Sequence, residues 1–215
     1  MTVIMSGEYS ELVSAMEERG NNVIPTKCVS CFHQPEQFHA DMQVLRIRDR
    51  IFTLDKCRRK PSRDYPNNVL LNCLFLGNRL YGKLSANDET VLEYCNEHGI
   101  ELVNVNQGYT RCSTLVVNDN AVITADLSIE KAMKQNGVEV LRISPGQIRL
   151  EGFDYGFIGG CSGRIGNTIF FFGNIKMHSD YSGIKDYIMQ HNSKIEILCD
   201  NMPLTDIGGF VEVER

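Results

Sequence analysis

Apolar and polar positions follow one another along this chain in a unit that recurs about every 40 residues. In the clearest copy, at 109–143, two runs rich in β-branched residues flank the polar turn NDN, which predicts a β-hairpin. The next segment, SIEKAMKQN, predicts a helix that Ser128 or Asp126 can cap and that Gly137 can end. Because the apolar run VEVLRI follows, the pattern predicts the order strand, strand, helix, strand, or ββαβ.

The same order is predicted for further segments, so the fold class is α/β. Four modules lie at about 36–68, 69–105, 106–143 and 156–198. In the first of them the polar segment KCRRKPSRDYPNN stands where the helix is expected. A fifth module combines 199–215, which ends in one strand, with 1–26, which supplies a helix and a strand. Repeats of this length form an open solenoid or a closed ring, and a module divided between both ends favours the ring. We therefore predict a single domain, 1–215, built as a five-module α/β propeller.

Composition narrows the classes of partner. The chain has 215 residues, 42% of them hydrophobic, which is sufficient for one sizeable core. A formal charge of -5 gives no reason to expect nucleic acid as a partner. No apolar run reaches the ~18 residues of a spanning helix, so we expect no membrane partner. Eight cysteines without a secretory signal pattern are typical of reduced thiols, which predicts a cytoplasmic location.

Cys28, Cys31 and His33, with His39 and Cys57 nearby, have side chains that suit zinc. A structural zinc site normally needs a second pair of ligands, and only Cys57 follows nearby. The alternative is that these are loop or core residues, and the sequence leaves both interpretations open. We expect no metal site and no cofactor elsewhere.

Four modules place a polar or thiol side chain about six residues before the hairpin turn, where a strand favours Val or Ile. The side chains are those of Gln43, Asn72, Cys112 or Ser113, and Cys161. In a ring, equivalent positions on the innermost strands converge on the axis. Convergent polar groups in a hollow indicate a ligand site. An equal alternative is that small or polar residues merely fill a tight axial channel and bond to water.

Two segments beside this layer carry further candidates for ligand binding. Gln107 belongs to QGYTRC, and Ser162 belongs to the glycine-rich segment GGCSGR, whose backbone N–H groups could approach an anion. Asp126, at the end of a strand, could either receive a cationic group or cap the next helix.

Cys112 and Cys161 are the candidate nucleophiles. Arg111 directly precedes the first, and Arg164 follows the second closely. A neighbouring guanidinium lowers the pKa of a thiol and so raises the fraction of reactive thiolate.

Five motifs resemble an uncharacterised bacterial family that is assigned to the pentein fold, also called the guanidino-modifying-enzyme fold. They cover about 39–209 and read HADMQ, QGYTRCSTLVV, ITAD, DYGFIGGCSG and PLTDIGG. Five ββαβ modules, the last completed by the first part of the chain, are similar to the same fold. Penteins include arginine and agmatine deiminases, dimethylarginine hydrolases and amidinotransferases, as well as a non-enzymatic ribosome anti-association factor. The resemblance therefore implies the fold and leaves the activity open.

The resemblance also implies which catalytic groups are missing. Catalytic penteins have a nucleophilic cysteine near the C-terminus, where this chain reads TDIGGF at 205–210, and the last cysteine here is Cys199. Their general-acid histidine begins the fourth module, where this chain has GGC at 159–161. Carboxylates are needed to bind a buried guanidinium. The resemblance implies that three carboxylates could have this role in the present chain, namely Asp41, Asp126 and Asp206.

We favour a non-hydrolytic protein that binds a small polar ligand, guanidino- or amino-acid-like, at the propeller axis. One alternative is a guanidino-modifying or related hydrolase or transferase with a relocated nucleophile, Cys112 or Cys161. Another is a protein-interaction module without enzymatic activity. A homo-oligomer is compatible with all three. The expected ligand-binding residues are Asp41, Gln43, Asn72, Gln107, Arg111, Cys112, Ser113, Asp126, Cys161, Ser162 and Asp206.

Overall fold

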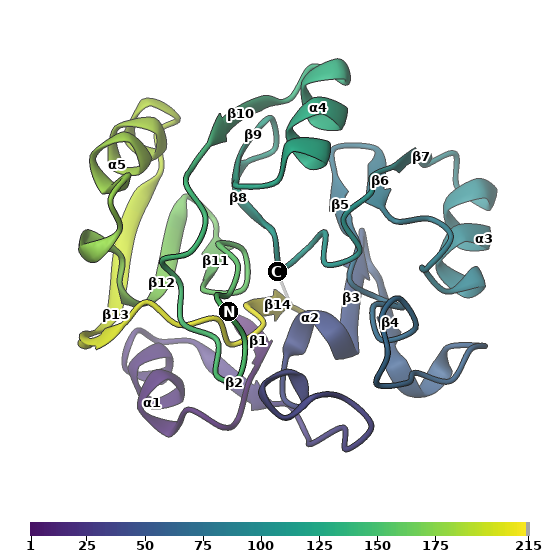
Figure 1. Cartoon of the computed structure of the whole chain (residues 1–215), viewed down its shortest axis with the longest axis horizontal. Helices are drawn as coiled ribbons and strands as arrows, with labels where there is room; N and C mark the ends of the chain where they lie inside the picture. Colours follow the sequence, from purple (N-terminus) through teal and green to yellow (C-terminus); the bar gives the residue numbers. More distant parts are fainter. Residues whose placement is uncertain (214–215) are drawn as a thin grey trace.

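The computed structural model describes residues 1–213, whose strands form five small sheets around a common centre (Figure 1). In hydrogen-bonded order the sheets are β14 (Phe210–Glu212), β1 (Thr2–Met5) and β2 (Asn22–Pro25); β3 (Val44–Ile47) and β4 (Arg50–Thr53); β5 (Leu74–Leu76), β6 (Arg79–Gly82) and β7 (Glu101–Asn104); β8 (Thr114–Asn118), β9 (Ala121–Thr124) and β10 (Glu139–Arg142); β11 (Ser162–Ile165), β12 (Thr168–Asn174) and β13 (Lys194–Pro203).

Each three-stranded sheet has the same pairing pattern. Its first strand is antiparallel to the second, and the third is parallel to the second after a helical crossover. The sheet of β14, β1 and β2 contains both ends of the described chain, because Val3 pairs with Glu212 and Val23. The sequence pattern indicated α1 and β2 at this end but not β1 itself.

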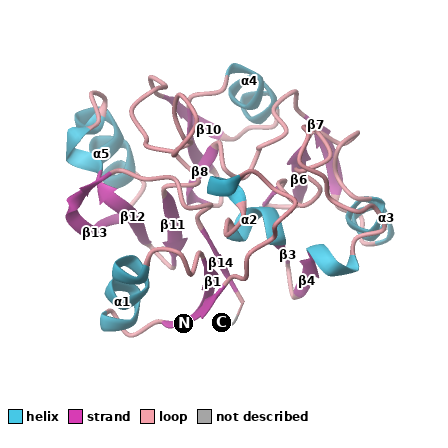
Figure 2. Ribbon diagram, turned by 60° about the horizontal axis from the view of Figure 1, so that its bottom comes forward, coloured by secondary structure: helices cyan, strands magenta, loops and turns pink. Residues whose placement is uncertain are grey.

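Four helices of nine or ten residues lie on the outside of the molecule, whereas a short fifth helix lies near its middle (Figure 2). The outer helices are α1 (Ser10–Glu18), α3 (Glu89–Glu97), α4 (Leu127–Gln135) and α5 (Tyr181–Gln190), and the inner helix is α2 (Ala40–Gln43). Three 3-10 turns occur at η1 (Gln34–Glu36), η2 (Leu54–Lys56) and η3 (Ile175–Met177). No helix within residues 1–213 is long and apolar enough to cross a membrane.

Helix α4 shows why local sequence determines these elements. Asp126 accepts hydrogen bonds from the backbone N–H groups of Ser128 and Ile129, which have no partner within the helix. Ile129 and Met133, one turn apart, are buried against the neighbouring sheet. Gly137 then adopts a φ of 77°, which ends the helix at low steric cost.

Apolar side chains fill the spaces between adjacent sheets rather than the middle of the molecule. Leu115 and Ile123 from one sheet pack with Ile169 and Phe171 from the next, and similar clusters join three other pairs of neighbours. The centre of the molecule is thereby left to side chains that hydrogen-bond to one another.

Candidate functional site

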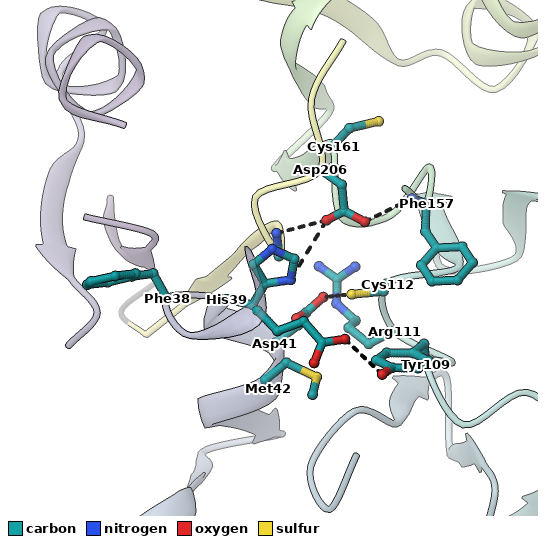
Figure 3. A network of polar contacts seen from close by, with 12 residues as sticks. Phe38, His39, Asp41, Met42, Tyr109, Arg111, Cys112, Phe157, Cys161 and Asp206 are labelled. Atoms are coloured by element: carbon teal, nitrogen blue, oxygen red, sulfur yellow. Dashed lines mark hydrogen bonds and ion pairs between the residues drawn. The ribbon is translucent and has the colours of Figure 1, made fainter. Parts of the chain in front are cut away.

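Four ionisable side chains are buried together where the inner ends of the sheets meet (Figure 3). We call His39, Asp41, Cys112 and Asp206 the central cluster. Their exposed fractions are 3%, 2%, 2% and 1%, respectively. Burial of four such groups is expensive unless they pair with one another or with a ligand.

Helix α2 provides two members of the cluster. His39 is the residue before the helix and Asp41 lies in its first turn. The N–H of Asp41 donates to the carbonyl of Gly208, which ties this turn to the segment that carries Asp206. The His39 side chain lies beside Asp206, whereas the Asp41 side chain meets Cys112.

Asn72 holds Cys112 in place. Its Oδ1 accepts from the backbone N–H groups of Arg111 and Cys112 at 2.9 and 3.2 Å, and its Nδ2 lies 3.5 Å from the thiol. The turn that precedes β8 is thus fixed by a buried side chain from the neighbouring module.

Asp206 occupies a space that exists because its neighbours are glycines. Its Oδ2 accepts from the N–H of Phe157 at 2.8 Å and its Oδ1 from the N–H of Gly208 at 3.0 Å. A Cβ on Gly160 would lie 1.9 Å from Oδ1, and one on Gly156 would lie 2.5 Å from the Asp206 Cβ. The glycine-rich segment that was expected to approach an anion lies against this carboxylate.

Within the cluster, the Cys112 thiol donates to Asp41 Oδ2 at 2.6 Å, and His39 Nδ1 lies 3.9 Å from Asp206 Oδ1. Burial raises the pKa of Asp41 to about 8 and that of Asp206 to about 6, and nearby Asp206 adds to the shift of Asp41. Burial likewise holds the pKa of the Cys112 thiol well above its usual value and lowers that of His39 to about 4. Each shift disfavours charge, because burial removes water from these groups, and nearby Arg111 offsets the shift of Asp41 only in part.

Two atoms of the cluster, His39 Nε2 and Asp41 Oδ1, have no hydrogen-bond partner among the described residues. In the same part of the chain, His39, Cys112 and Asp206 are the one set of three or more His, Cys, Asp or Glu residues whose ligand atoms all lie within 4.8 Å of one another.

A second buried chain of hydrogen bonds runs beside the cluster. The Tyr109 hydroxyl donates to Glu36 Oε1 at 2.8 Å and accepts from Asn68 Nδ2 at 2.6 Å. Sequence reasoning passed over Glu36. It named His39 only as a neighbour of the candidate zinc residues Cys28, Cys31 and His33 and as the first residue of HADMQ.

The expected site residues separate into several places. Asp41, Cys112 and Asp206 come together at the centre (Figure 3). Asn72 joins them, because its Nδ2 lies 3.5 Å from the Cys112 thiol. Gln43 does not join them, because its amide donates to the carbonyls of Lys27 and Gln37.

Cys161 and Ser162 are both buried beside Asp206. The Cys161 thiol lies 3.3 Å from the carbonyl of Ile158, and the Ser162 hydroxyl donates to the same oxygen at 2.6 Å. Burial raises the pKa of the Cys161 thiol well above its usual value, and the nearby Asp206 carboxylate adds to this shift. Neither side chain is therefore set up as a nucleophile in this conformation.

Gln107, Ser113 and Asp126 line a cavity of about 130 Å³ beside the central cluster. Gln107 Nε2 donates to Asp126 Oδ2 at 3.2 Å. The Ser113 hydroxyl is buried and finds no partner within residues 1–213. Two aromatic residues, Tyr155 and Phe157, complete part of the wall. Phe157 also connects the cavity to the cluster, because its N–H binds Asp206.

Arg111 points elsewhere. Its guanidinium donates to the carbonyls of Thr114 and Phe210, both at 3.4 Å, and lines a wider cavity of about 630 Å³ together with Ser162. The first strands of all five sheets contribute to this wider cavity. Two of its other arginines are paired with carboxylates, Arg164 with Asp119 and Arg46 with Glu212.

The CxxC segment lies away from these cavities. Cys28 and Cys31 are exposed, and the Cys28 thiol lies 3.3 Å from Gln37 Oε1. His33 Nδ1 accepts from Arg63 at 3.2 Å. Within the described part of the chain these three side chains do not form a metal-ligand cluster.

Five small sheets around a polar centre define a protein of the pentein fold. A cysteine-to-serine mutant of DDAH from Pseudomonas aeruginosa, complexed with citrulline, matches with a TM-score of 0.54 at 11% identity, over 93% of this chain and 92% of that one. Agmatine deiminase from C. jejuni matches with a TM-score of 0.52 at 8% identity, over 92% and 87%. Both are pentein-fold enzymes, so the predicted resemblance is confirmed at the level of the fold.

Residues 46–211 match the family described as "Family of unknown function (DUF6873)", and the chain belongs to that family. No curated protein matches the sequence. Identities as low as those of the two enzymes carry the fold and not the activity.

Proposed function

We propose that this protein is a cytoplasmic five-module α/β propeller that binds a small cationic ligand, guanidino- or amino-acid-like, beside its centre without hydrolysing it. The repeated strand pairing supports the propeller, with the fifth module completed by β14 from one end of the chain and β1, α1 and β2 from the other. Eight free thiols support a reducing compartment.

The observation that carries the ligand proposal is the smaller cavity. It combines the Asp126 carboxylate with a Gln107 amide and with a Ser113 hydroxyl that lacks a partner in the described structure. A carboxylate and a free hydroxyl suit the N–H groups of a guanidinium or ammonium. The rings of Tyr155 and Phe157 add surfaces that attract cations.

The size of the cavity limits the ligand. Its volume of about 130 Å³ is close to the ~150 Å³ of a cavity that holds benzene. A guanidino or amino head group fits this space, with the rest of the molecule extending toward solvent.

Absence of hydrolysis is supported by the state of the two candidate nucleophiles. The thiolate is the nucleophilic form of cysteine, and burial raises the pKa of both Cys112 and Cys161. Neither residue lines the smaller cavity. The enzyme alternative requires a conformation in which one of these thiols is ionised and exposed to the ligand.

The test is a thermal-shift series with agmatine, arginine and citrulline, followed by calorimetry. A ligand that binds the folded protein at 100 times its Kd stabilises it by about 2.7 kcal/mol. We expect agmatine and arginine to raise the Tm. Citrulline, whose side chain is uncharged, should shift the Tm less than arginine does.

Asp126→Asn is the informative variant, because asparagine caps a helix as well as aspartate does. It removes the charge from the cavity while keeping the start of α4, so the ligand-induced shift should vanish in a folded protein. Asp88→Asn, at the cap of α3, is the matched control and should keep the shift. Equal shifts in Asp126→Asn and the wild type would contradict the proposed site. If chromatography shows that the protein consumes the ligand, the claim that the protein does not hydrolyse it is contradicted.

A further inference from the structure

The central cluster contains a donor set that the proposed ligand does not use. His39, Cys112 and Asp206 each present one ligand atom, all within 4.8 Å of one another, and none of the three lines the smaller cavity. Asp41 lies outside this set and borders it, because its Oδ2 accepts from the Cys112 thiol at 2.6 Å. An imidazole, a thiol and carboxylates are the side chains that zinc prefers.

Two independent features show that the cluster is incomplete by itself. His39 Nε2 and Asp41 Oδ1 are buried and, within the described chain, unpartnered, although a buried polar atom is normally bonded. The nearby guanidinium of Arg111 donates to the carbonyls of Thr114 and Phe210 instead. A metal cation would supply positive charge and accept lone pairs from several of these atoms at once.

We propose that the central cluster binds one zinc ion, with His39, Cys112 and Asp206 as ligands and Asp41 beside them. Binding would transfer the Cys112 thiol proton to Asp41 Oδ2, to which the thiol already donates, because the thiolate is the form that binds the metal. This inference is independent of the ligand assigned to the smaller cavity.

Outer contacts already hold two of these ligands, as expected at metal sites. The N–H groups of Phe157 and Gly208 hold Asp206, and Asn72 fixes the turn of Cys112. All three ligands and the adjoining Asp41 are buried, which shields the ion from bulk solvent.

The experiment uses the full chain with Cys28→Ser and Cys31→Ser, because both thiols are exposed and would bind metal by themselves. The protein is loaded with zinc or cobalt, and excess metal is removed. We expect one equivalent of zinc per chain by elemental analysis. Cobalt should give a sulfur-to-cobalt charge-transfer band and the intense visible bands of a tetrahedral site.

Cys112→Ser should abolish the charge-transfer band and weaken zinc binding by at least about 100-fold, more than loss of an outer contact does. Cys161→Ser is the matched control, since it removes a buried thiol next to the cluster and should leave the band unchanged. Circular dichroism verifies that both variants are folded.

The spectrum of the parent protein tests the proposal even if a variant fails to fold. Less than half an equivalent of zinc together with no charge-transfer band would overturn the proposal. It would also be overturned by a band that survives in folded Cys112→Ser, or by equal loss of the band in folded Cys161→Ser.

Discussion

Replacing Gly160 by alanine tests the geometry on which the central cluster depends. The added Cβ would lie 1.9 Å from Asp206 Oδ1, whereas atoms in contact are separated by about 3.5 Å. The backbone cannot easily retreat, because the carbonyl of Gly160 accepts from the N–H groups of Ile207 and Gly209 at 3.0 and 2.8 Å. The Asp206 carboxylate must therefore move.

Movement of the carboxylate weakens its bonds to the N–H groups of Phe157 and Gly208, which are 2.8 and 3.0 Å long. Hydrogen bonds to a charged group contribute about 1.5–3 kcal/mol each. Overpacking alone costs about 1–3 kcal/mol. Because partial relaxation will keep one bond, we expect Gly160→Ala to lower the free energy of unfolding by about 3–5 kcal/mol, a large part of the 5–15 kcal/mol typical of a folded protein.

Urea unfolding followed by circular dichroism measures this change. Gly183→Ala is the control, because Gly183 lies in α5 and no atom of residues 1–213 comes within 4 Å of the added Cβ. Alanine is the better helix former there, so this variant should gain about 0.5–1 kcal/mol. A loss below about 1 kcal/mol in Gly160→Ala, or similar losses in both variants, would refute the argument.

Three further predictions concern single side chains. Tyr109→Phe leaves buried Glu36 without its hydroxyl donor, so the free energy of unfolding should fall by about 1–3 kcal/mol in urea. Burial lowers the pKa of His178 in the folded protein, so as the pH falls the unfolded state takes up a proton at this residue before the folded state does. The free energy of unfolding should therefore decline as the pH falls below about 6.5, and His178→Asn should show a smaller decline. Iodoacetamide should label exposed Cys28 at least about 100 times faster than fully buried Cys161, as mass spectrometry of digests can measure; equal rates would contradict the burial.

Sequence reasoning succeeded where neighbouring residues determine the outcome. The segment from β8 to β10 was recognisable because its turn, its cap and its terminal glycine are all local signals. For Asp126 the sequence left two roles open, and the structure shows why. One oxygen caps α4, while the other accepts from Gln107 at the cavity.

Distant contacts explain what the sequence could not show. Glu36 meets Tyr109 across 73 residues, and no local pattern encodes that meeting. Counting back from the hairpin turns selected Asn72 and Cys112, and the structure places these two side chains 3.5 Å apart. The same count misplaced Gln43, because α2 interrupts the extended chain there and directs its amide toward the preceding loop.

The pairing of β1 with β14 also sets the order in which this molecule is assembled. Val3 must find Glu212, and joining such remote partners costs more chain entropy than closing a hairpin. The local hairpins should therefore form early. We expect β14 to pair last and this step to limit the rate of folding. Until it docks, the edge of β1 is open to pairing with another chain, which makes the nascent protein prone to aggregation at this edge.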